Sequence, residues 1–200
     1  MADYRIITIS RQFGSGGRTI GKKLAEKLGI PCYDQEIIAA VAKESGFSKD
    51  YIAEHGDDVN TTWMGNIFQV GGSLSNQDVM WVAQSNVVRE LAAKGPCVIV
   101  GRCADYILRD DYKLLKVFVF ADVKARAERI VKLYGERTLS PEKRLKNKDR
   151  RRSAYYRHYT DLKWGDAANY HVSLDSGALG VDTCVDIIAD VYAEVQKHDQ

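Results

Sequence analysis

The chain has 200 residues and a formal net charge of +2, with 45% hydrophobic and 28% charged residues. These values are ordinary for a globular domain, and the charge argues neither for nor against a nucleic-acid partner. No run of 18 apolar residues is present, so we expect no transmembrane helix and no membrane partner. The N-terminus enters a strand pattern directly, without a signal peptide, which predicts a cytoplasmic location. The four cysteines form no CxxC pair and no metal-ligand pattern with the four histidines, so reduced thiols are expected.

Apolar patterns divide the chain into strands that alternate with helices. Strands are predicted at 5–9, 31–33, 97–101, 114–121 and 170–174. A first helix ends at Gly29-Ile30-Pro31, and further helices are predicted at 35–44, 48–55, 78–94, 102–108, 122–134, 140–159 and 181–196. In the helix at 78–94 the residues predicted to face the core are Val79, Val82, Ala83, Val87, Leu91 and Ala92. This alternation predicts one α/β domain over 1–200, with a parallel sheet, helices on both faces and ligands at the carboxyl ends of the strands.

A glycine-rich stretch follows the first strand. Residues 14–19 are Gly-Ser-Gly-Gly-Arg-Thr, between a β-branched run and an amphipathic helix. A strand, a glycine turn and a helix N-terminus together present backbone N–H groups and the positive end of a helix dipole, which attract an anion. A tight turn without a ligand is the alternative. Three glycines in four positions exceed what a turn needs, so phosphate binding is the favoured interpretation.

This stretch departs from the P-loop pattern G-x-x-x-x-G-K-[ST]. With Gly16 as the second glycine, Arg11 stands in place of the first glycine and Gly17 in place of the lysine. With Gly17 as the second glycine, Arg18-Thr19 stands in place of the lysine and the hydroxyl residue. Either register retains a candidate cation, Arg18 or Arg11, and a candidate hydroxyl on Thr19.

Two further segments have an unusual composition. Residues 56–77 are rich in Gly, Asp, Asn, Thr and Ser, and form either a substrate-covering flap or a surface excursion pinned by Trp63 and Phe68. Residues 140–160 carry eight Lys and Arg against two carboxylates, a net charge of +6, which leaves −4 for the rest of the chain. Three interpretations of this basic helix are open: a lid over transferring phosphates, a nucleic-acid-binding patch, or a solvated helix face. The glycine-rich turn favours the lid, and the acidic remainder argues against nucleic acid.

Five short stretches carry a family resemblance. They are Ile-Thr-Ile at 7–9, the stretch 14–19, Tyr33-Asp34, Val100-Gly101-Arg102, and a helix with Asp149, Arg152, Tyr155 and Tyr156. Together they resemble the cytidylate kinase-like family, a divergent branch of the P-loop nucleoside monophosphate kinases. The resemblance implies a P-loop NTPase-type three-layer α/β/α fold with a five-stranded parallel sheet, a monophosphate-binding part at 34–95 and a basic helical lid at 136–165. It implies an ATP-dependent phosphotransferase acting on CMP, dCMP or a related small phosphorylated acceptor.

The same resemblance assigns residues to the site. The ATP phosphates would be bound by Gly14, Ser15, Gly16, Gly17, Arg18 and Thr19, with Thr19 facing Mg²⁺. Asp34 matches an acidic residue near the acceptor nucleotide, where it either approaches Mg²⁺ through water or caps the next helix. Arg102 matches an arginine that contacts the acceptor phosphate. Together with Arg18 and Arg102, the predicted catalytic cations are the lid arginines Arg150, Arg151 and Arg152.

The chain also departs from the family pattern at three places. The P-loop lysine is absent, Val100 stands where cytidylate kinase has an acidic residue, and Cys103 stands where it has another. Specificity for cytosine therefore does not follow from the resemblance. A nucleotide- or phosphate-binding module without kinase activity remains the alternative function, and nucleic-acid binding through the basic helix is the third.

Overall fold

The computed structural model describes residues 6–34 and 76–197. The strands are β1 (Ile6–Arg11), β2 (Cys32–Tyr33), β3 (Cys97–Val100), β4 (Leu114–Phe120) and β5 (Val172–Asp175). The helices are α1 (Gly17–Leu28), α4 (Asn76–Ala93), α5 (Ala104–Ile107), α6 (Val123–Tyr134), α7 (Pro141–Thr160) and α8 (Val181–Lys197), with a short 3-10 helix η2 (Ala167–Asn169). The helices predicted at 35–44 and 48–55, and the predicted flap up to residue 75, lie outside the described residues. Within the described ranges, no helix is long and apolar enough to cross a membrane.

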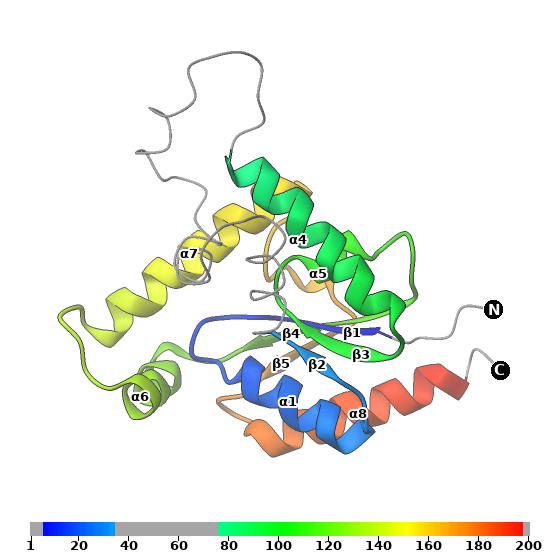
Figure 1. Ribbon diagram of the computed structural model, residues 1–200. Helices are drawn as coiled ribbons and strands as arrows, with labels where there is room; N and C mark the ends of the chain where they lie inside the picture. The colour runs from blue at the N-terminus through cyan, green and yellow to red at the C-terminus, as the bar shows by residue number, and fades with distance from the viewer. Residues whose placement is uncertain (1–5, 35–75, 198–200) are drawn as a thin grey trace, which may run out of the picture.

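The five strands form one parallel sheet in the order β2-β3-β1-β4-β5, with β1 in the centre. In this register Ile9 of β1 lies beside Val100 of β3 and Val117 of β4. Because all strands run in the same direction, their carboxyl ends meet at one edge (Figure 1). At that edge β1 runs into the glycine-rich stretch and β3 into Gly101, so the predicted parallel sheet is confirmed and brings both motifs to one side.

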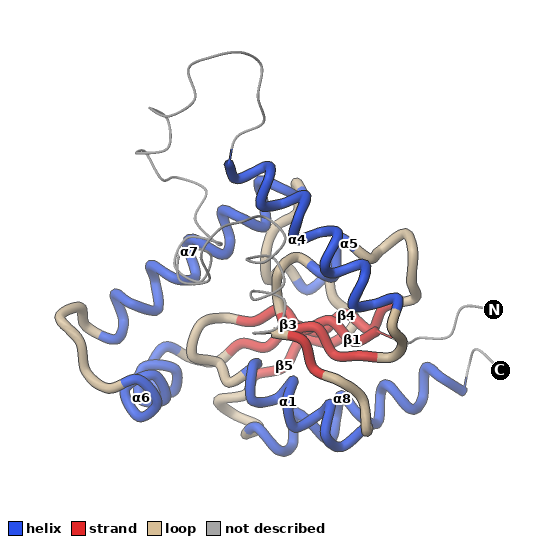
Figure 2. The backbone as a smooth tube through the Cα atoms, in the orientation of Figure 1, coloured by secondary structure: helices blue, strands red, loops and turns tan. Residues whose placement is uncertain are grey.

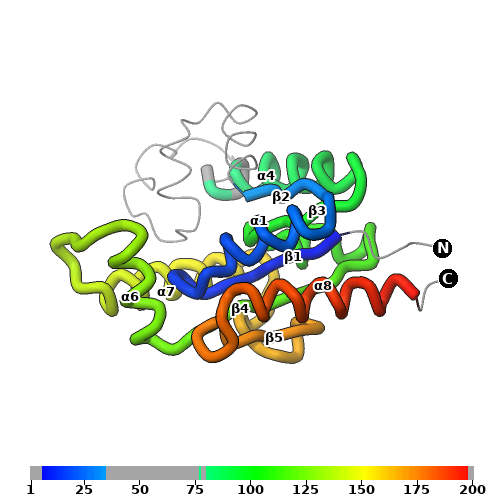
Figure 3. Tube along the Cα trace, turned by 90° about the horizontal axis from the view of Figure 1, so that it is seen from below, coloured from blue at the N-terminus to red at the C-terminus, as the bar shows by residue number. Residues whose placement is uncertain are grey.

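Helices cover both faces of the sheet, which confirms the three-layer α/β/α fold. Helices α1 and α8 lie on one face, and α4, α5 and α7 on the other (Figures 1 and 2). Seen from below, α1 and α8 run side by side over the strands (Figure 3). Successive strand side chains point to opposite faces, so Ile7 and Ile9 pack with Leu24 of α1, whereas Ile6 packs with Val87 of α4. Each such buried side chain contributes about 1.5–3 kcal/mol.

Local sequence signals set the ends of several helices. The Asp122 carboxylate accepts the amide three residues on at 2.9 Å and caps α6, whose start agrees with the helix predicted at 122–134. The Ser140 hydroxyl caps α7 in the same way, with Pro141 at the first helical position. Gly29 adopts the left-handed conformation that ends α1.

Two predicted boundaries are corrected. β1 continues two residues beyond the predicted strand, because Arg11 still pairs with Val119 of β4. Pairing with β4 thus continues β1 for two residues beyond the apolar run that predicted it. α4 begins at Asn76, two residues before the predicted start and inside the segment predicted as a flap.

The core-facing side of α4 also differs from the prediction. Val82 is 49% exposed, whereas Val88 is fully buried. Met80 and Val87 define the buried stripe, and Val82 lies about 200° around the helix from Met80 at ~100° per residue. The prediction that Val82 faces the core was therefore wrong, because it was made from the apolar character of the residue and not from its position around the helix.

Candidate functional site

The glycine loop, residues 12–17, connects β1 to α1 at the carboxyl edge of the sheet (Figure 1). Gly14 and Gly16 have φ values of 78° and 82°, in the region that favours glycine. Ser15 is fully buried, and its amide and hydroxyl both donate to the Gln12 carbonyl oxygen, at 3.3 and 2.9 Å. The Ser15 side chain therefore shapes the loop from the inside, which leaves backbone groups as the loop's contribution to ligand binding.

The N-terminus of α1 has the features of an anion-binding site. Gly16 is the N-cap and has no side chain to cap with, so it makes no side-chain hydrogen bond. The amides of the first helical turn, at Gly17, Arg18 and Thr19, have no carbonyl partner within a helix. They lie with the positive end of the helix dipole at the ligand edge of the sheet. Because Gly16 closes the loop and Gly17 is already helical, Gly17 occupies the position of the P-loop lysine.

Neighbouring helices hold the outer part of the loop. Asp149 of α7 accepts the Phe13 amide at 2.7 Å and pairs with Arg126 of α6 at 2.5 Å. Arg126 is buried and also donates to the Phe13 carbonyl oxygen at 3.2 Å. Arg129, one helical turn on, donates to the Gly14 carbonyl oxygen at 2.9 Å. The loop is thus bonded directly to the helix that the sequence predicts as a lid.

The turn after β5 supports the loop from the other side. The buried Ser176 hydroxyl lies within hydrogen-bonding distance of the Ser15 carbonyl oxygen, and at 3.1 Å from the Phe120 carbonyl oxygen. It has one proton and so donates to one of them at a time. The Asp175 carboxylate accepts the Gly177 amide at 2.9 Å, which orders the same turn. The connection from β5 to α8 is therefore part of the loop's frame.

Two predicted site residues, Arg18 and Asp34, contact each other. Arg18 Nε lies 2.5 Å from Asp34 Oδ2, and the two side chains are 46% and 13% exposed. Thr19 is exposed and lines a groove between α1 and α6. The other lining residues are Arg18, Lys22, Lys23 and Glu26 of α1 and Leu133 and Tyr134 of α6. The predicted metal ligands Thr19 and Asp34 therefore both lie near Arg18.

β3 ends in a left-handed turn. Gly101, Arg102 and Cys103 have φ values of 78°, 59° and 54°. Non-glycine residues adopt this conformation rarely, and it persists only where the surroundings hold it. Here Gln84, a buried side chain of α4, donates from Nε2 to the Arg102 carbonyl oxygen at 3.0 Å. The strained turn fixes Arg102 at the same sheet edge as the glycine loop.

A small pocket opens where β1 and β3 end, and we call it the Arg102 pocket. It is lined by Ser10, Arg11, Gly101, Arg102, Cys103, Arg152, Tyr155, Tyr156 and Trp164. Arg152 of α7 also donates to the Arg11 carbonyl oxygen at 3.1 Å. Three of these described lining residues are arginines and none is acidic. The lining therefore offers three guanidinium groups, whose N–H groups are the donors that phosphate oxygens accept.

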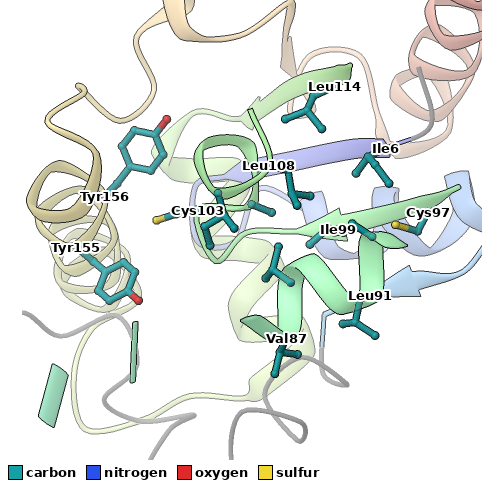
Figure 4. Packing of buried hydrophobic residues seen from close by; sticks show 14 of the residues in the cluster. Ile6, Val87, Leu91, Cys97, Ile99, Cys103, Leu108, Leu114, Tyr155 and Tyr156 are labelled. Carbon is teal, nitrogen blue, oxygen red and sulfur yellow. The ribbon is translucent and has the colours of Figure 1, made fainter. Parts of the chain in front are cut away.

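A buried carboxyl–phenol pair lies beside the Arg102 pocket. Tyr156 donates to Asp105 Oδ2 at 2.7 Å, and Asp105 is only 5% exposed. Burial raises the pKa of the Asp105 carboxyl. Burial and the nearby Asp105 charge raise the pKa of Tyr156 and raise that of Tyr170 to about 12. Tyr155 and Tyr156 extend from α7 toward Cys103 (Figure 4), so these tyrosines pack α7 onto α4 and α5.

The three consecutive arginines of α7 point to different surroundings, since residues on a helix are ~100° apart. Arg152 lines the Arg102 pocket. Arg151 lines a second pocket, which includes Phe13 and Arg144. Arg150 is exposed. Of the predicted lid arginines, the described structure brings Arg152 alone together with Arg102.

The donor set fits a magnesium–nucleotide complex better than a metal bound by protein alone. In residues 6–34 and 76–197, no group of three His, Cys, Asp or Glu side chains could hold a metal ion. Mg²⁺ usually keeps several waters and is held by one or two carboxylates together with substrate phosphates. Asp34, paired with Arg18 of the first turn of α1, places a carboxylate close to the N-terminus of that helix, where amides attract an anion.

Several supporting residues were not found from the sequence. Gln84, Asp105 and Ser176 are buried polar side chains, and each bonds to a residue far away in the chain. Their spacing resembles that of exposed polar residues, so no periodic signal marks them. Arg126 and Arg129 differ from these, because Asp122 predicts the start of α6 and the sequence indicates that both arginines, which follow within two turns, face the lid.

The parallel sheet, the glycine loop at its carboxyl edge and the adjacent arginine pocket define the class: a phosphotransferase of the P-loop kinase type. A gluconokinase from Sinorhizobium meliloti has this fold, with a TM-score of 0.59, 18% sequence identity and full coverage of both chains. The family model of the cytidylate kinase-like family matches residues 6–178, and the chain belongs to this family. The family prediction from the sequence is thereby confirmed.

Two relatives show how much of the chain is shared. The cytidylate kinase of Methanopyrus kandleri is 23% identical over 192 residues, which cover 92% of this chain and 90% of that protein. An uncharacterized protein from Eubacterium ventriosum, solved by crystallography, aligns with a TM-score of 0.72 and 30% identity, over 94% of this chain and 98% of that one. The similarity therefore extends over nearly the whole chain.

Proposed function

We propose that the protein transfers the γ-phosphoryl group of ATP to CMP, dCMP or a related small phosphorylated acceptor. The observation that carries the proposal is the shared sheet edge: the glycine loop and the Arg102 pocket lie at the carboxyl ends of the adjacent strands β1 and β3. A donor phosphate at the loop and an acceptor phosphate in the pocket would therefore meet. A cytoplasmic location, where ATP and monophosphates are found, belongs to the same proposal.

On the donor side, the amides at the start of α1 would bind the terminal phosphates of ATP. Arg129, Asp149 and Ser176 hold the loop from three directions, so little reorganisation is needed when a nucleotide binds. Mg²⁺, when bound, would neutralise charge between the donor phosphates. Asp34 would hold it through water. With Gly17 at the lysine position, Arg18 stands at the usual hydroxyl position, so the proposed second contact is the hydroxyl of Thr19, one residue further along α1.

On the acceptor side, Arg102 and Arg152 would bind the acceptor phosphate. That phosphate is already ionised at neutral pH, so transfer needs no general base and depends on positioning and charge neutralisation. The predicted lid, 136–165, would exclude water through α7. Val100 and Cys103 are both buried and carry no charge, so the described part of the pocket offers no carboxylate to read a cytosine.

The test is a substrate panel. The purified protein is incubated with ATP, Mg²⁺ and, in turn, CMP, dCMP, UMP, AMP and GMP, and the formation of ADP is followed. We expect turnover with one or two monophosphates, CMP or dCMP foremost. ATP binding without turnover would instead support the alternative, a binding module without kinase activity. Salt-sensitive binding of oligonucleotides would support the nucleic-acid role of the basic helix.

A variant pair tests the role assigned to Arg102. Arg102→Ala should raise the KM for the acceptor by about 10- to 100-fold, because a charge-assisted phosphate contact is lost, and should leave ATP affinity nearly unchanged. Arg109→Ala removes an arginine of the same segment, outside the Arg102 pocket, that lies over the Tyr106 ring. It should leave both constants unchanged. An equal effect of Arg102→Ala on both substrates would contradict the assignment.

A further inference from the structure

We propose that Arg11, from the end of β1, supplies the cation that the glycine loop lacks at its lysine position. The Arg11 guanidinium would neutralise charge on the transferring phosphoryl group, between the glycine loop and the Arg102 pocket. This inference rests on the proposed function, since it assigns a catalytic residue to that phosphoryl transfer.

The first observation is the space beside Gly17. A Cβ atom added at Gly17 would lie 2.6 Å from the Arg11 Cβ and 3.0 Å from its Cγ. The Arg11 Cβ cannot move aside, because β1 is fixed by its pairing with Val119 of β4. The stem of Arg11 therefore fills the place through which a lysine side chain at position 17 would leave the helix. Glycine at 17 and arginine at 11 are matched to each other.

The second observation is the position of the guanidinium group. A Cβ atom added at Gly101 would lie 2.8 Å from the Arg11 Cζ and closer still to one of its terminal nitrogens. The charged end of Arg11 thus lies against the backbone at the end of β3, directly before Arg102. One side chain therefore starts beside the glycine loop at Gly17 and ends in the Arg102 pocket. The lysine of a P-loop reaches the β- and γ-phosphates, and Arg11 spans the corresponding interval here.

The third observation concerns charge. Arg11, Arg102 and Arg152 line the same pocket, and the described lining holds no carboxylate. A phosphate acceptor and the γ-phosphate of a nucleotide together bring several negative charges to one place. Arg102 and Arg152 at the acceptor, and Arg11 between acceptor and donor, would offset these negative charges. A guanidinium group can bind two phosphate oxygens at once.

Arg18 is the other cation that could replace the lysine. Its Nε is paired with Asp34 at 2.5 Å, and Arg18 lines the groove between α1 and α6 with Thr19 and Lys22. Arg11 instead lines the pocket at the end of β3. The geometry therefore favours Arg11 over Arg18.

The experiment moves the cation between the two positions. Arg11→Met keeps most of the stem and removes the charge, and we expect kcat to fall about 100-fold or more, as for loss of one transition-state donor. Gly17→Lys alone should also be impaired, because its side chain meets the Arg11 stem. The double variant Arg11→Ala/Gly17→Lys clears that space and restores a lysine at the usual P-loop position. Its kcat should be at least about tenfold higher than that of Arg11→Met.

Binding supplies a readout that does not depend on turnover. Calorimetry with a non-hydrolysable ATP analogue and with ADP gives the preference of each variant for the γ-phosphate. Arg11→Met should reduce that preference about tenfold, which corresponds to roughly 1.4 kcal/mol. Arg109→Ala should retain the wild-type preference, and thermal melts check that each variant is folded.

The outcomes separate the inference from the proposed function. A wild-type protein without turnover on any monophosphate refutes the proposed function and the catalytic role of Arg11 with it. With an active wild type, an Arg11→Met variant within about threefold of wild-type kcat and with an unchanged γ-phosphate preference overturns the inference alone. So does a larger kcat loss for Arg18→Ala than for Arg11→Met. Failure of the double variant to exceed Arg11→Met would mean that Arg11 does not stand in for the lysine.

Discussion

Arg18 and Asp34 form an ion pair between the first turn of α1 and the end of β2, with Arg18 Nε 2.5 Å from Asp34 Oδ2. The sequence assigned them separate tasks, one at the donor phosphates and one near the acceptor or Mg²⁺. Their contact means that a guanidinium occupies one oxygen of the carboxylate proposed to approach the metal. The two residues should therefore have opposite effects on the requirement for Mg²⁺.

We expect Asp34→Asn to raise the Mg²⁺ concentration needed for half-maximal activity at fixed ATP by about 3- to 10-fold, or roughly 0.7–1.4 kcal/mol. Arg18→Ala should lower that concentration, because it removes a cation that competes for Asp34. Both variants should lose less than about 1 kcal/mol of unfolding free energy, since the Arg18 side chain is half exposed. Magnesium titrations of the initial rate measure this, and an unchanged requirement in Asp34→Asn would refute the metal role.

The contact of α7 with the glycine loop gives a second prediction. Asp149→Asn removes the carboxylate that pairs with the buried Arg126 and accepts the Phe13 amide. Loss of one partner leaves a buried cation, so we expect a loss of roughly 2–4 kcal/mol of unfolding free energy, below the range for a wholly buried pair because Asp149 is partly exposed. Urea unfolding measures it. The double variant Asp149→Asn/Arg126→Met should lose less than Asp149→Asn, and an equal or larger loss would contradict this explanation.

Much of the fold followed from local signals in the sequence. The strand at 97–101 is a continuous apolar run and the strand at 114–121 is apolar apart from Lys116, as expected for buried parallel strands, and both were placed within a residue. The starts of α6 and α7 follow from Asp122 and Ser140, whose caps act within three residues. The glycine loop was found because its composition exceeds what a turn requires.

The arrangement of the site did not follow, because it depends on tertiary contacts. α7 is strongly charged and has no clear apolar stripe, so its sequence does not say that Arg152 faces the Arg102 pocket and Arg150 faces solvent. The contact of Arg11 with Gly17 and Gly101 joins three elements, and the spacing of the three residues in the sequence gives no sign of it. Only the folded sheet brings them together.

The Asp105–Tyr156 pair gives a third prediction. Tyr156→Phe removes the donor to a buried carboxyl group, so we expect a loss of about 1–3 kcal/mol of unfolding free energy. Tyr155→Phe is the matched control, because its hydroxyl is 3.5 Å from Gln84 Oε1, at the limit of a hydrogen bond. It should lose less than Tyr156→Phe in urea unfolding. Equal losses would mean that the hydrogen bond to Asp105 contributes nothing beyond ring packing.

His171 gives a prediction about pH. Its Nδ1 accepts the Lys116 amide at 3.2 Å, and burial, with the Lys116 charge, lowers its pKa below the ordinary value near 6.5. The unfolded chain therefore binds more protons between the two pKa values, so the stabilisation is complete above about pH 6.5 and is lost as pH falls through the folded pKa. Between about pH 7.5 and about pH 5.5 the urea midpoint of the wild type should decrease more than that of His171→Asn, which keeps an acceptor but does not titrate. Equal decreases in the two proteins would assign the pH dependence to other groups.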